Sequence, residues 1–566
     1  MTGLKLLCEF FRFHRLPVAG VVVLDIFAGI FTILLPLIIA QLLAEVFSFQ
    51  SARGAMIEQL GIPLTFTLQQ WIWLFFTIIL VKFSLDFFKK KQKGELTELL
   101  LFWLREKLFR QQLKMDIRVY EEKGTGKYLL RFSGDLSSVK NFVSKGILQF
   151  FADGVLMIIG MVFICWLDWQ LSVIIVTVLL ILGVVVAFLN RKIGQVEEQR
   201  RNKKSGLLAF VSNRLLHIAT LRAFNKITPE LYTFQTKARK VKEWSVSYYR
   251  WASLIDALVP LAIYSILVLL FVVISMRQES MGTLANDALF AVVLILLSWR
   301  STIRRVFRIG LVWKKGKLSL DKLAVLFDRP VEKGWQRKSI HCKGWRLQLE
   351  NVSLKLRNKM VFHQLTFDLE VGQRALIKGA SGSGKSTLVK LLAGLYQPDQ
   401  GELLLANQSM QQFSPKQCRK KMTFVSDLFP LYGKNIIEAI SYSKRTQDKT
   451  ALLFADWQRL FPQLAPLSLV TVVHDTSCLS AAQQQLLLWL RAISTRKKIF
   501  ILDEPFKNLN QDSAIKLWQQ LPTQSSVLLL SAEDWPSFAF DWEIDLENIQ
   551  KKHKKSASLG NISTNQ

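Results

Sequence analysis

The sequence contains Gly379-Ala380-Ser381-Gly382-Ser383-Gly384-Lys385-Ser386-Thr387, which fits the pattern G-x-x-x-x-G-K-[ST] throughout. Residues 373–378 predict a strand before this stretch, and residues 388–392 predict a helix after it. In that context, the glycines let backbone N–H groups surround a phosphate, Lys385 reaches the β and γ oxygens, and Ser386 ligates Mg²⁺. The stretch therefore predicts an α/β P-loop domain that binds a nucleoside triphosphate. A glycine-rich turn before an ordinary helix is the alternative.

A second motif completes the predicted nucleotide site. The short apolar run 499–502 precedes Asp503-Glu504-Pro505. An aspartate at the carboxyl end of such a strand can hold Mg²⁺ through water, and the next glutamate can orient the attacking water. Together with Lys385 and Ser386, these carboxylates supply a full set of residues for a magnesium nucleotide.

Apolar blocks of membrane-spanning length lie before about residue 310. They cover residues 17–44, 64–85, 147–166, 171–190, 254–276 and 284–299. Residues 167–170 alone separate the third block from the fourth, which predicts a tight hairpin. Buried core helices of a large soluble protein are the alternative, and the length and regular flanks of the blocks disfavour it.

The basic residues predict how these blocks are oriented. The formal net charge is +31, and segments 86–145 and 191–250 each carry 14 Lys or Arg, whereas the opposite loops hold little more than Arg53 and Arg277. The positive-inside rule then predicts a multi-pass protein of the cytoplasmic (inner) membrane, with six spans and both termini in the cytoplasm. The first block lacks a cleavage site and is expected to be a retained span.

Composition disfavours two other classes of site. No aromatic-interleaved basic stripe accompanies the positive charge, so nucleic acid is not an expected partner. The 5 Cys and 6 His residues are scattered without metal-ligand spacing. The cysteines are expected to be reduced thiols, and no metal site of protein nitrogen and sulfur is expected.

We expect three parts along the chain. An amphipathic helix follows Arg300, and a linker with Gly334 and Lys338 leads to two predicted strands, residues 345–349 and 352–356. The expected parts are a transmembrane domain with two long cytoplasmic loops over 1–335, a nucleotide-binding cassette over 336–550 and a disordered basic tail over 551–566.

These features resemble the ATP-binding cassette (ABC) family, specifically half-transporter exporters, in which an all-α six-span domain precedes one cassette. Residues 125–135 and 218–224 are similar to their first and second intracellular loops, and Gly282-Thr283-Leu284 is similar to the motif that opens their sixth span. The resemblance covers nearly the whole chain. It implies an ATPase that moves a substrate across the membrane and forms its two ATP sites across a dimer.

The family signature LSGGQ reads Leu479-Ser480-Ala481-Ala482-Gln483 in this chain. The resemblance implies that this segment faces ATP bound by the opposite subunit, with Ser480 and Gln483 as nucleotide-binding residues and a helix N-terminus at the γ-phosphate. The two alanines would cost affinity if either position needs a positive φ.

Four further family positions are altered. Asp427 stands in place of the metal-sensing glutamine; it can accept from a metal-bound water but cannot donate. Ala532 replaces the switch histidine, so no side chain there can bind the γ-phosphate. Asn510 replaces an aspartate after the catalytic glutamate. Leu356 replaces the adenine-stacking aromatic residue, so stacking is weakened or is supplied by another residue such as Phe362.

The altered motifs predict that ATP and Mg²⁺ still bind but that hydrolysis is slow or partner-dependent. Ser386, Asp503 and Asp427 are the expected metal residues, and Glu504 is the expected base or water-orienting group. Positioning of the water and the γ-phosphate provides most of the rate in phosphoryl transfer, and two of those groups are missing. A heterodimer with a catalytically intact second half-transporter is favoured over a homodimer.

Two other functions stay open at this point. One is a nucleotide-regulated, non-transporting membrane subunit, which the altered motifs favour and Glu504 disfavours. The other is a basic membrane protein that tethers nucleic acid or acidic lipid through its cytoplasmic loops. The exported substrate is not identified by the sequence. Arg300, Arg304, Arg305 and Arg308 share a helix face and either contact an anionic cargo or fix topology at the membrane lipid.

Overall fold

The computed structural model describes residues 3–46, 67–123, 128, 131–281, 285–332, 344–356, 359–441, 446–472 and 479–547. These residues form two compact units, one from Met1–Leu113 with Gly124–Arg329 and one from Lys114–Lys123 with Pro330–Gln566. A short piece of the first predicted cytoplasmic loop therefore packs with the second unit. Several predicted features lie outside the described residues: Thr125-Gly126, Leu130, Gly282-Thr283-Leu284, Gly334, Lys338 and the tail 551–566.

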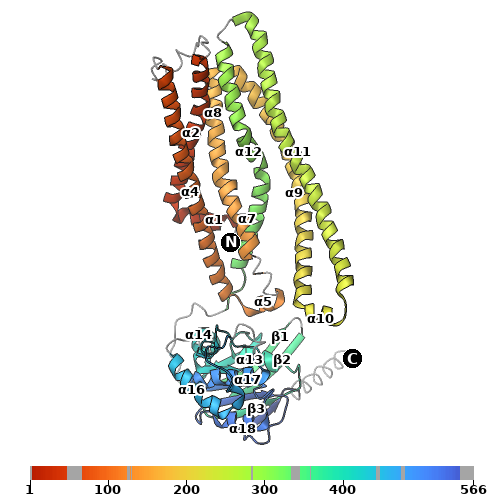
Figure 1. Ribbon diagram of the computed structural model, residues 1–566. Coiled ribbons are helices and arrows are strands. Elements are labelled where there is room, and N and C mark those ends of the chain that lie inside the picture. Colours follow the sequence, from red (N-terminus) through yellow and green to blue (C-terminus); the bar gives the residue numbers. More distant parts are fainter. Residues whose placement is uncertain are drawn as a thin grey trace, which may run out of the picture. The chain divides into compact units, whose positions relative to one another are not determined.

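The first unit consists of long helices that lie side by side (Figure 1). The long helices are α1 (Gly3–Phe13), α2 (Arg15–Val46), α4 (Leu68–Lys114), α8 (Gln149–Leu167), α9 (Trp169–Leu216), α11 (Ile227–Met281) and α12 (Ala285–Phe327). Shorter turns are η1 (Arg131–Asp135), α7 (Leu136–Asn141), η2 (Phe142–Leu148) and α10 (Ile218–Ala223). The turns η1 and η2 are π-helical.

Five helical stretches of the described part are long and apolar enough to cross a membrane: Arg15–Pro36, Leu68–Lys114, Leu136–Trp166, Trp169–Leu216 and Ile227–Val273. They contain the first five predicted apolar blocks, apart from the ends of blocks one, two and five. The sixth predicted block lies at the beginning of α12, and its crossing of the membrane stays a prediction.

The predicted hairpin between the third and fourth blocks is confirmed. Helix α8 ends at Leu167 and α9 begins at Trp169. The side chain of Asp168 accepts hydrogen bonds from the backbone N–H groups of Gln170 (2.9 Å) and Leu171 (3.4 Å). Aspartate at this N-cap position satisfies donors that the helix itself leaves unpaired, so one residue makes the turn.

Close approach between α8 and α12 requires glycine. A Cβ atom at Gly160 would lie 2.2 Å from the ring of Trp299, which is fully buried. The ring therefore occupies the space that any other residue at 160 would need. Trp299 belongs to a core shared with α9 and α11, which includes Ile175, Ile263 and Leu296.

The second unit contains two sheets. The antiparallel sheet has the order β2-β1-β4-β5 and the parallel sheet has the order β6-β7-β8-β3-β9. Their strands are β1 (Leu347–Leu356), β2 (Lys359–Leu369), β3 (Arg374–Lys378), β4 (Gln400–Leu405), β5 (Gln408–Ser409), β6 (Met422–Val425), β7 (Ile499–Asp503), β8 (Ser526–Ser531) and β9 (Trp542–Asp545). Strands β7 and β8 are buried along their whole length, which explains the apolar runs 499–502 and 527–530 within them.

Helices cover the sheets of the second unit (Figure 1). The helices of this unit are α5 (Ile117–Lys123), α13 (Lys385–Leu392), α14 (Pro415–Lys421), α15 (Ile436–Ser441), α16 (Gln447–Leu460), α17 (Ala481–Ser494) and α18 (Gln511–Gln519), with short 3₁₀ turns η4 (Met410–Gln412) and η6 (Pro462–Leu464). One expectation is wrong: residues 345–349 and 352–356 are not two strands. Residues 347–349 and 352–356 belong to the single strand β1, and 345–346 precede it; the pairing of β1 shifts between Leu349 and Val352, where Asn351 has a φ of 49°.

Candidate functional site

The parallel sheet brings three predicted motif segments to one edge. Strand β8 lies between β3 and β7, and all three are parallel, so their carboxyl ends meet there. The P-loop follows β3, Asp503 ends β7 and Ala532 follows β8. The backbone N–H of Gly379 donates to the carbonyl oxygen of Ser531 at 3.3 Å, and that of Glu504 donates to Leu530 at 2.9 Å.

The P-loop has the backbone that its glycines allow. Gly382 and Gly384 have φ values of 88° and 100°, in the left-handed region that favours glycine. A Cβ atom at Gly384 would also lie 3.1 Å from side-chain atoms of Val361 and Phe362. Helix α13 begins at Lys385, immediately after the loop. Its first N–H groups therefore border the site, as anion binding at a helix N-terminus requires.

Lys385 is held inside the loop. Its side chain is 7% exposed, and its ammonium donates to the carbonyl oxygens of Gly379 and, at 3.2 Å, Ala380. The same nitrogen lies 3.1 Å from Oε1 of Glu504. The predicted phosphate clamp and the predicted base therefore form an ion pair.

Glu504 joins the P-loop to the end of β8. Its Oε1 accepts a hydrogen bond from the backbone N–H of Ala532 at 3.0 Å. Its φ is 45°, a conformation that costs energy for a residue with a side chain and that is common at functional sites. Ala532 thus lies beside the carboxylate predicted to be catalytic and offers only a backbone donor there.

Asp503 is a buried carboxylate, 8% exposed, at the end of β7. Burial raises the pKa of Asp503, and the hydrogen bond that it accepts from the Ser426 hydroxyl at 2.9 Å opposes this shift. Ser426 was not predicted from the sequence as a site residue. The signal for it is its place directly after β6, the strand next to β7.

One pocket of about 420 Å³ contains both halves of the predicted site. Its lining residues are Ser381, Gly382, Gly384, Lys385, Ser386, Thr387, Asp427, Leu428, Asp503, Glu504 and Lys507. Of the remaining predicted P-loop residues, Gly379 and Ala380 accept from Lys385, and the backbone N–H of Ser383 donates to the carbonyl oxygen of Ala380 at 3.1 Å.

The donor set of this pocket fits Mg²⁺. The Ser386 hydroxyl and the carboxylates of Asp503 and Asp427 are hard oxygen ligands, which Mg²⁺ prefers together with phosphate oxygens and water. Within the described ranges, no group of three or more His, Cys, Asp or Glu residues is placed to hold a metal ion. A metal here would therefore depend on the hydroxyl and on the bound nucleotide. Asp427 pairs at 3.3 Å with Lys507, a residue that the sequence did not identify.

The signature segment lies apart from this pocket in the same chain. Ser480 is the N-cap of α17: its hydroxyl accepts from the Gln483 N–H at 3.2 Å, and the Gln483 side chain accepts from the Ser480 N–H at 2.8 Å. Ala481 and Ala482 form the first helical turn, and neither has a positive φ. The alanines would weaken nucleotide binding only if either position needed a positive φ, and neither has one.

Two other altered positions have local structural roles. Asn510 caps α18 and accepts from the Ser513 N–H at 3.0 Å, a task that asparagine and aspartate perform equally well. Phe362 is 3% exposed and packs in the core beneath Gly384. The expectation that Phe362 could stack on adenine is therefore wrong for this conformation. Leu356 is half-buried at the end of β1.

Comparison with known proteins agrees with this geometry. The family described as ABC transporter transmembrane region matches residues 18–300, and the ABC transporter family matches residues 362–507. An ATP-dependent lipid A-core flippase of Pasteurella multocida (strain Pm70) is 24% identical over 422 residues, covering 72% of each chain. A multidrug resistance ABC transporter ATP-binding and permease protein of Lactococcus lactis subsp. cremoris (strain MG1363) is 23% identical over 426 residues, covering 72% of this chain and 70% of the relative.

A solved structure has the same fold. It is described as a bacterial Atm1-family ABC exporter with ATP bound, and it superposes with a TM-score of 0.76 at 17% identity. The match covers 92% of this chain and 91% of the other. The predicted fold class, a helical transmembrane domain followed by an α/β cassette, is confirmed.

Proposed function

Since this chain belongs to the ABC transporter family, with a transmembrane region followed by an ATPase cassette, we propose that it is one half of a dimeric exporter in a bacterial inner membrane. ATP-driven translocation is the activity of this architecture. The finer proposal is that both termini are cytoplasmic, that two cassettes close on ATP, and that the hydrolysis rate depends on a second, catalytically intact half-transporter.

The observation that carries the proposal is the gathering of Lys385, Ser386, Asp503 and Glu504 around one pocket. Lys385 and the loop N–H groups bind the β- and γ-phosphates, and Glu504 orients the attacking water and accepts its proton. Ser386 and Asp503, with Asp427 beside them, would hold Mg²⁺, which neutralises phosphate charge when bound.

Slow hydrolysis follows from position 532. The end of β8 lies between the P-loop strand and the strand of Asp503, which supports the inference that a side chain at 532 would reach a γ-phosphate. Ala532 offers its backbone N–H, which is already bonded to Glu504. Loss of one transition-state donor typically costs about 10²–10³ in rate. Glu504 is retained, so residual turnover is expected.

Dimer composition decides how much these changes matter. In a homodimer, both ATP sites would carry Ala532 and the altered signature. With an intact partner, one site would combine the partner's catalytic groups with this chain's Ser480 and Gln483. The other site would combine this chain's Lys385 and Glu504 with the partner's unaltered signature. One competent site per dimer is then enough for turnover, and we favour this heterodimer.

The chain connects the cassette to a predicted membrane span through helix α5. Helix α5 packs with the second unit: the Arg118 guanidinium donates to the Gln397 carbonyl oxygen at 2.7 Å, and Lys390 pairs with Glu121 at 2.7 Å. Helix α5 closely follows α4, which contains a predicted span. Closure of two cassettes on ATP would therefore act on that span through α5.

The second candidate is a subunit that binds ATP as a ligand without transport. The hydrogen bond from the Ala532 backbone N–H to Glu504 favours this second candidate. The bond engages the carboxylate of the proposed base, and position 532 lacks the side-chain donor that the family has for the γ-phosphate. The two candidates are separated by isolating the complex from its native membrane in nanodiscs and measuring its mass and ATP hydrolysis. A complex of two different chains that hydrolyses ATP supports the proposal. A dimer of identical chains with normal turnover overturns the heterodimer, and a complex without turnover favours the regulatory subunit.

A further inference from the structure

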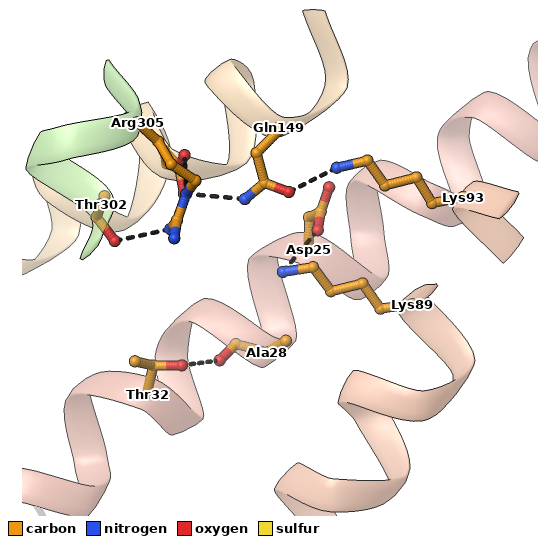
Figure 2. A network of polar contacts seen from close by, with 9 residues as sticks. Asp25, Ala28, Thr32, Lys89, Lys93, Gln149, Thr302 and Arg305 are labelled. Carbon is orange, nitrogen blue, oxygen red and sulfur yellow. Dashed lines mark hydrogen bonds and ion pairs between the residues drawn. The ribbon is translucent and has the colours of Figure 1, made fainter. Parts of the chain in front are cut away.

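Polar and charged side chains from the four helices α2, α4, α8 and α12 meet inside the first unit (Figure 2). Asp25 of α2, 3% exposed, pairs with Lys89 of α4 at 2.8 Å. One helical turn further along α4, Lys93 donates to Oε1 of Gln149 on α8 at 2.6 Å. Polar residues are expensive to bury unless they are paired, so this network holds α2, α4 and α8 in register.

Asp153 and Arg305 satisfy each other within this network. The Asp153 side chain is 6% exposed and accepts from Nε and Nη2 of Arg305 at 2.8 and 2.7 Å. It also accepts from Gln149 at 3.0 Å, and Arg305 donates to Thr302 at 3.0 Å. This bidentate ion pair strongly fixes the relative orientation of the two side chains. Asp153 is thus fully engaged, and Arg305 has a structural role between α8 and α12.

A pocket of about 340 Å³ lies beside this pair and carries an excess of positive charge. Its lining is Lys145, Gln149, Phe150, Asp153, Arg304, Arg305, Val306, Arg308, Ile309 and Val312. The only carboxylate in that lining is Asp153, which Arg305 already neutralises. Lys145, Arg304 and Arg308 therefore have no acidic partner within the pocket.

The surroundings do not compensate all three of these cations. Arg308 lies 3.3 Å from Asp256 of α11, outside the pocket lining. Nε of Arg304 is buried and has no hydrogen-bond partner among the described residues. A desolvated guanidinium N–H without an acceptor is unfavourable, so this arrangement is suited to an incoming acceptor.

Lys145 is brought to the pocket by an unusual backbone. It lies in η2, a π-helical segment, and such segments are rare and are frequent at functional sites. The Gly146 carbonyl oxygen accepts from Nε1 of Trp313 on α12 at 2.7 Å, and a Cβ at Gly146 would lie 3.3 Å from that ring. The close packing of η2 on α12 holds Lys145 on the same pocket as Arg304 and Arg308.

We propose that this pocket binds an anionic group, a phosphate or carboxylate, of the exported substrate, with Lys145, Arg304 and Arg308 as its ligands. The inference rests on the proposed export function and names its substrate class. Charge-assisted hydrogen bonds to the anion would supply the missing acceptor of Arg304. Phe150 and Ile309 form an apolar wall for the part of the substrate that bears the anion.

The test uses the full chain in phosphatidylcholine nanodiscs without nucleotide, titrated with dodecyl phosphate as the probe. Charged hydrogen bonds in desolvated sites are strong, so Arg304→Gln is expected to weaken binding by about tenfold or more. Lys317→Gln is the matched control, because it removes one positive charge from an exposed position of the same helix outside the pocket. Arg304→Lys should restore part of the affinity, which separates loss of charge from misfolding.

Two competitors distinguish the source of the anion. Inorganic phosphate displaces the probe if a free anion suffices, and phosphatidic acid in the nanodisc displaces it if a lipid headgroup is the occupant. Equal binding by wild type and Arg304→Gln would overturn the proposal, and so would an equal loss in Lys317→Gln. The assay contains no ATP, so a chain that fails to hydrolyse ATP still reports on this pocket.

Discussion

The ammonium of Lys385 lies 3.1 Å from Oε1 of Glu504. The proposed phosphate clamp and the proposed base, which are expected to act on opposite sides of a γ-phosphate, thus neutralise each other. We infer that a lysine–phosphate contact would replace this ion pair and leave Glu504 to orient water. The pair therefore links phosphate binding to exposure of the base.

Lys385→Ala should remove most of the nucleotide affinity. The lysine supplies the buried positive charge of the loop, and a charged hydrogen bond is worth roughly 1.5–3 kcal/mol. Affinity for MgATP is then expected to fall by about ten- to a hundredfold, which equilibrium binding to the full chain in lipid would measure. Lys516→Ala, on α18 outside the pocket, is the control. Unchanged MgATP affinity in Lys385→Ala would show that the P-loop lysine does not bind the nucleotide.

Ala532→His should raise the rate of ATP hydrolysis. The new imidazole would add a donor between the P-loop and Glu504, and recovery of one transition-state donor predicts a gain of at least about tenfold. Steady-state hydrolysis in lipid provides the measurement. Ala532→Leu adds bulk without a donor and should give no gain. A histidine variant no faster than the leucine variant would mean that position 532 does not limit the rate.

Asp503→Asn should change thermal stability and nucleotide binding in opposite directions. Burial raises the folded-state pKa of Asp503 above its ordinary value. The carboxyl therefore favours folding at low pH, and that contribution is lost as pH rises through the raised pKa. At neutral pH, the amide should increase thermal stability of the nucleotide-free chain and weaken Mg²⁺-dependent ATP binding. Lower stability at neutral pH, with intact hydrogen bonding from Ser426, would contradict this explanation.

Gly384→Ala should damage the P-loop. A Cβ there meets Val361 and Phe362, and the φ of 100° disfavours any side chain. Thermal stability and MgATP affinity should both fall. Gly206→Ala is the matched control, because it lies in α9 with nothing within 4 Å of the new Cβ, and it should stabilise by about 0.5–1 kcal/mol. Equal behaviour of the two variants would exclude the conformational argument.

The features that the sequence predicted well are those with local causes. The P-loop is recognisable because its glycines, Lys385 and Ser386 occupy fixed offsets between a strand and a helix. The turn at Asp168 follows from a capping side chain between two apolar blocks. The apolar blocks themselves are long enough to be read as helices in lipid.

Other features depend on contacts between distant segments. The bond from Ser426 to Asp503 joins the ends of two neighbouring strands and has no local signature. Phe362 is buried in β2 because it packs in a core of residues from distant segments, and Gly384 lies against its ring. The arginines Arg304, Arg305 and Arg308 after the sixth block all line the pocket, yet only Arg305 is bound by Asp153, the one carboxylate of that lining. Sequence spacing alone could not separate these roles.

The central claim is that this cassette binds MgATP through Lys385 and hydrolyses it slowly through Glu504. The most direct test measures MgATP binding and ATP hydrolysis by the purified chain in lipid, for wild type and Glu504→Gln. The account predicts saturable binding in both proteins and a low rate in wild type that disappears in the variant. Failure of wild type to bind MgATP, or a hydrolysis rate that Glu504→Gln leaves unchanged, would contradict it.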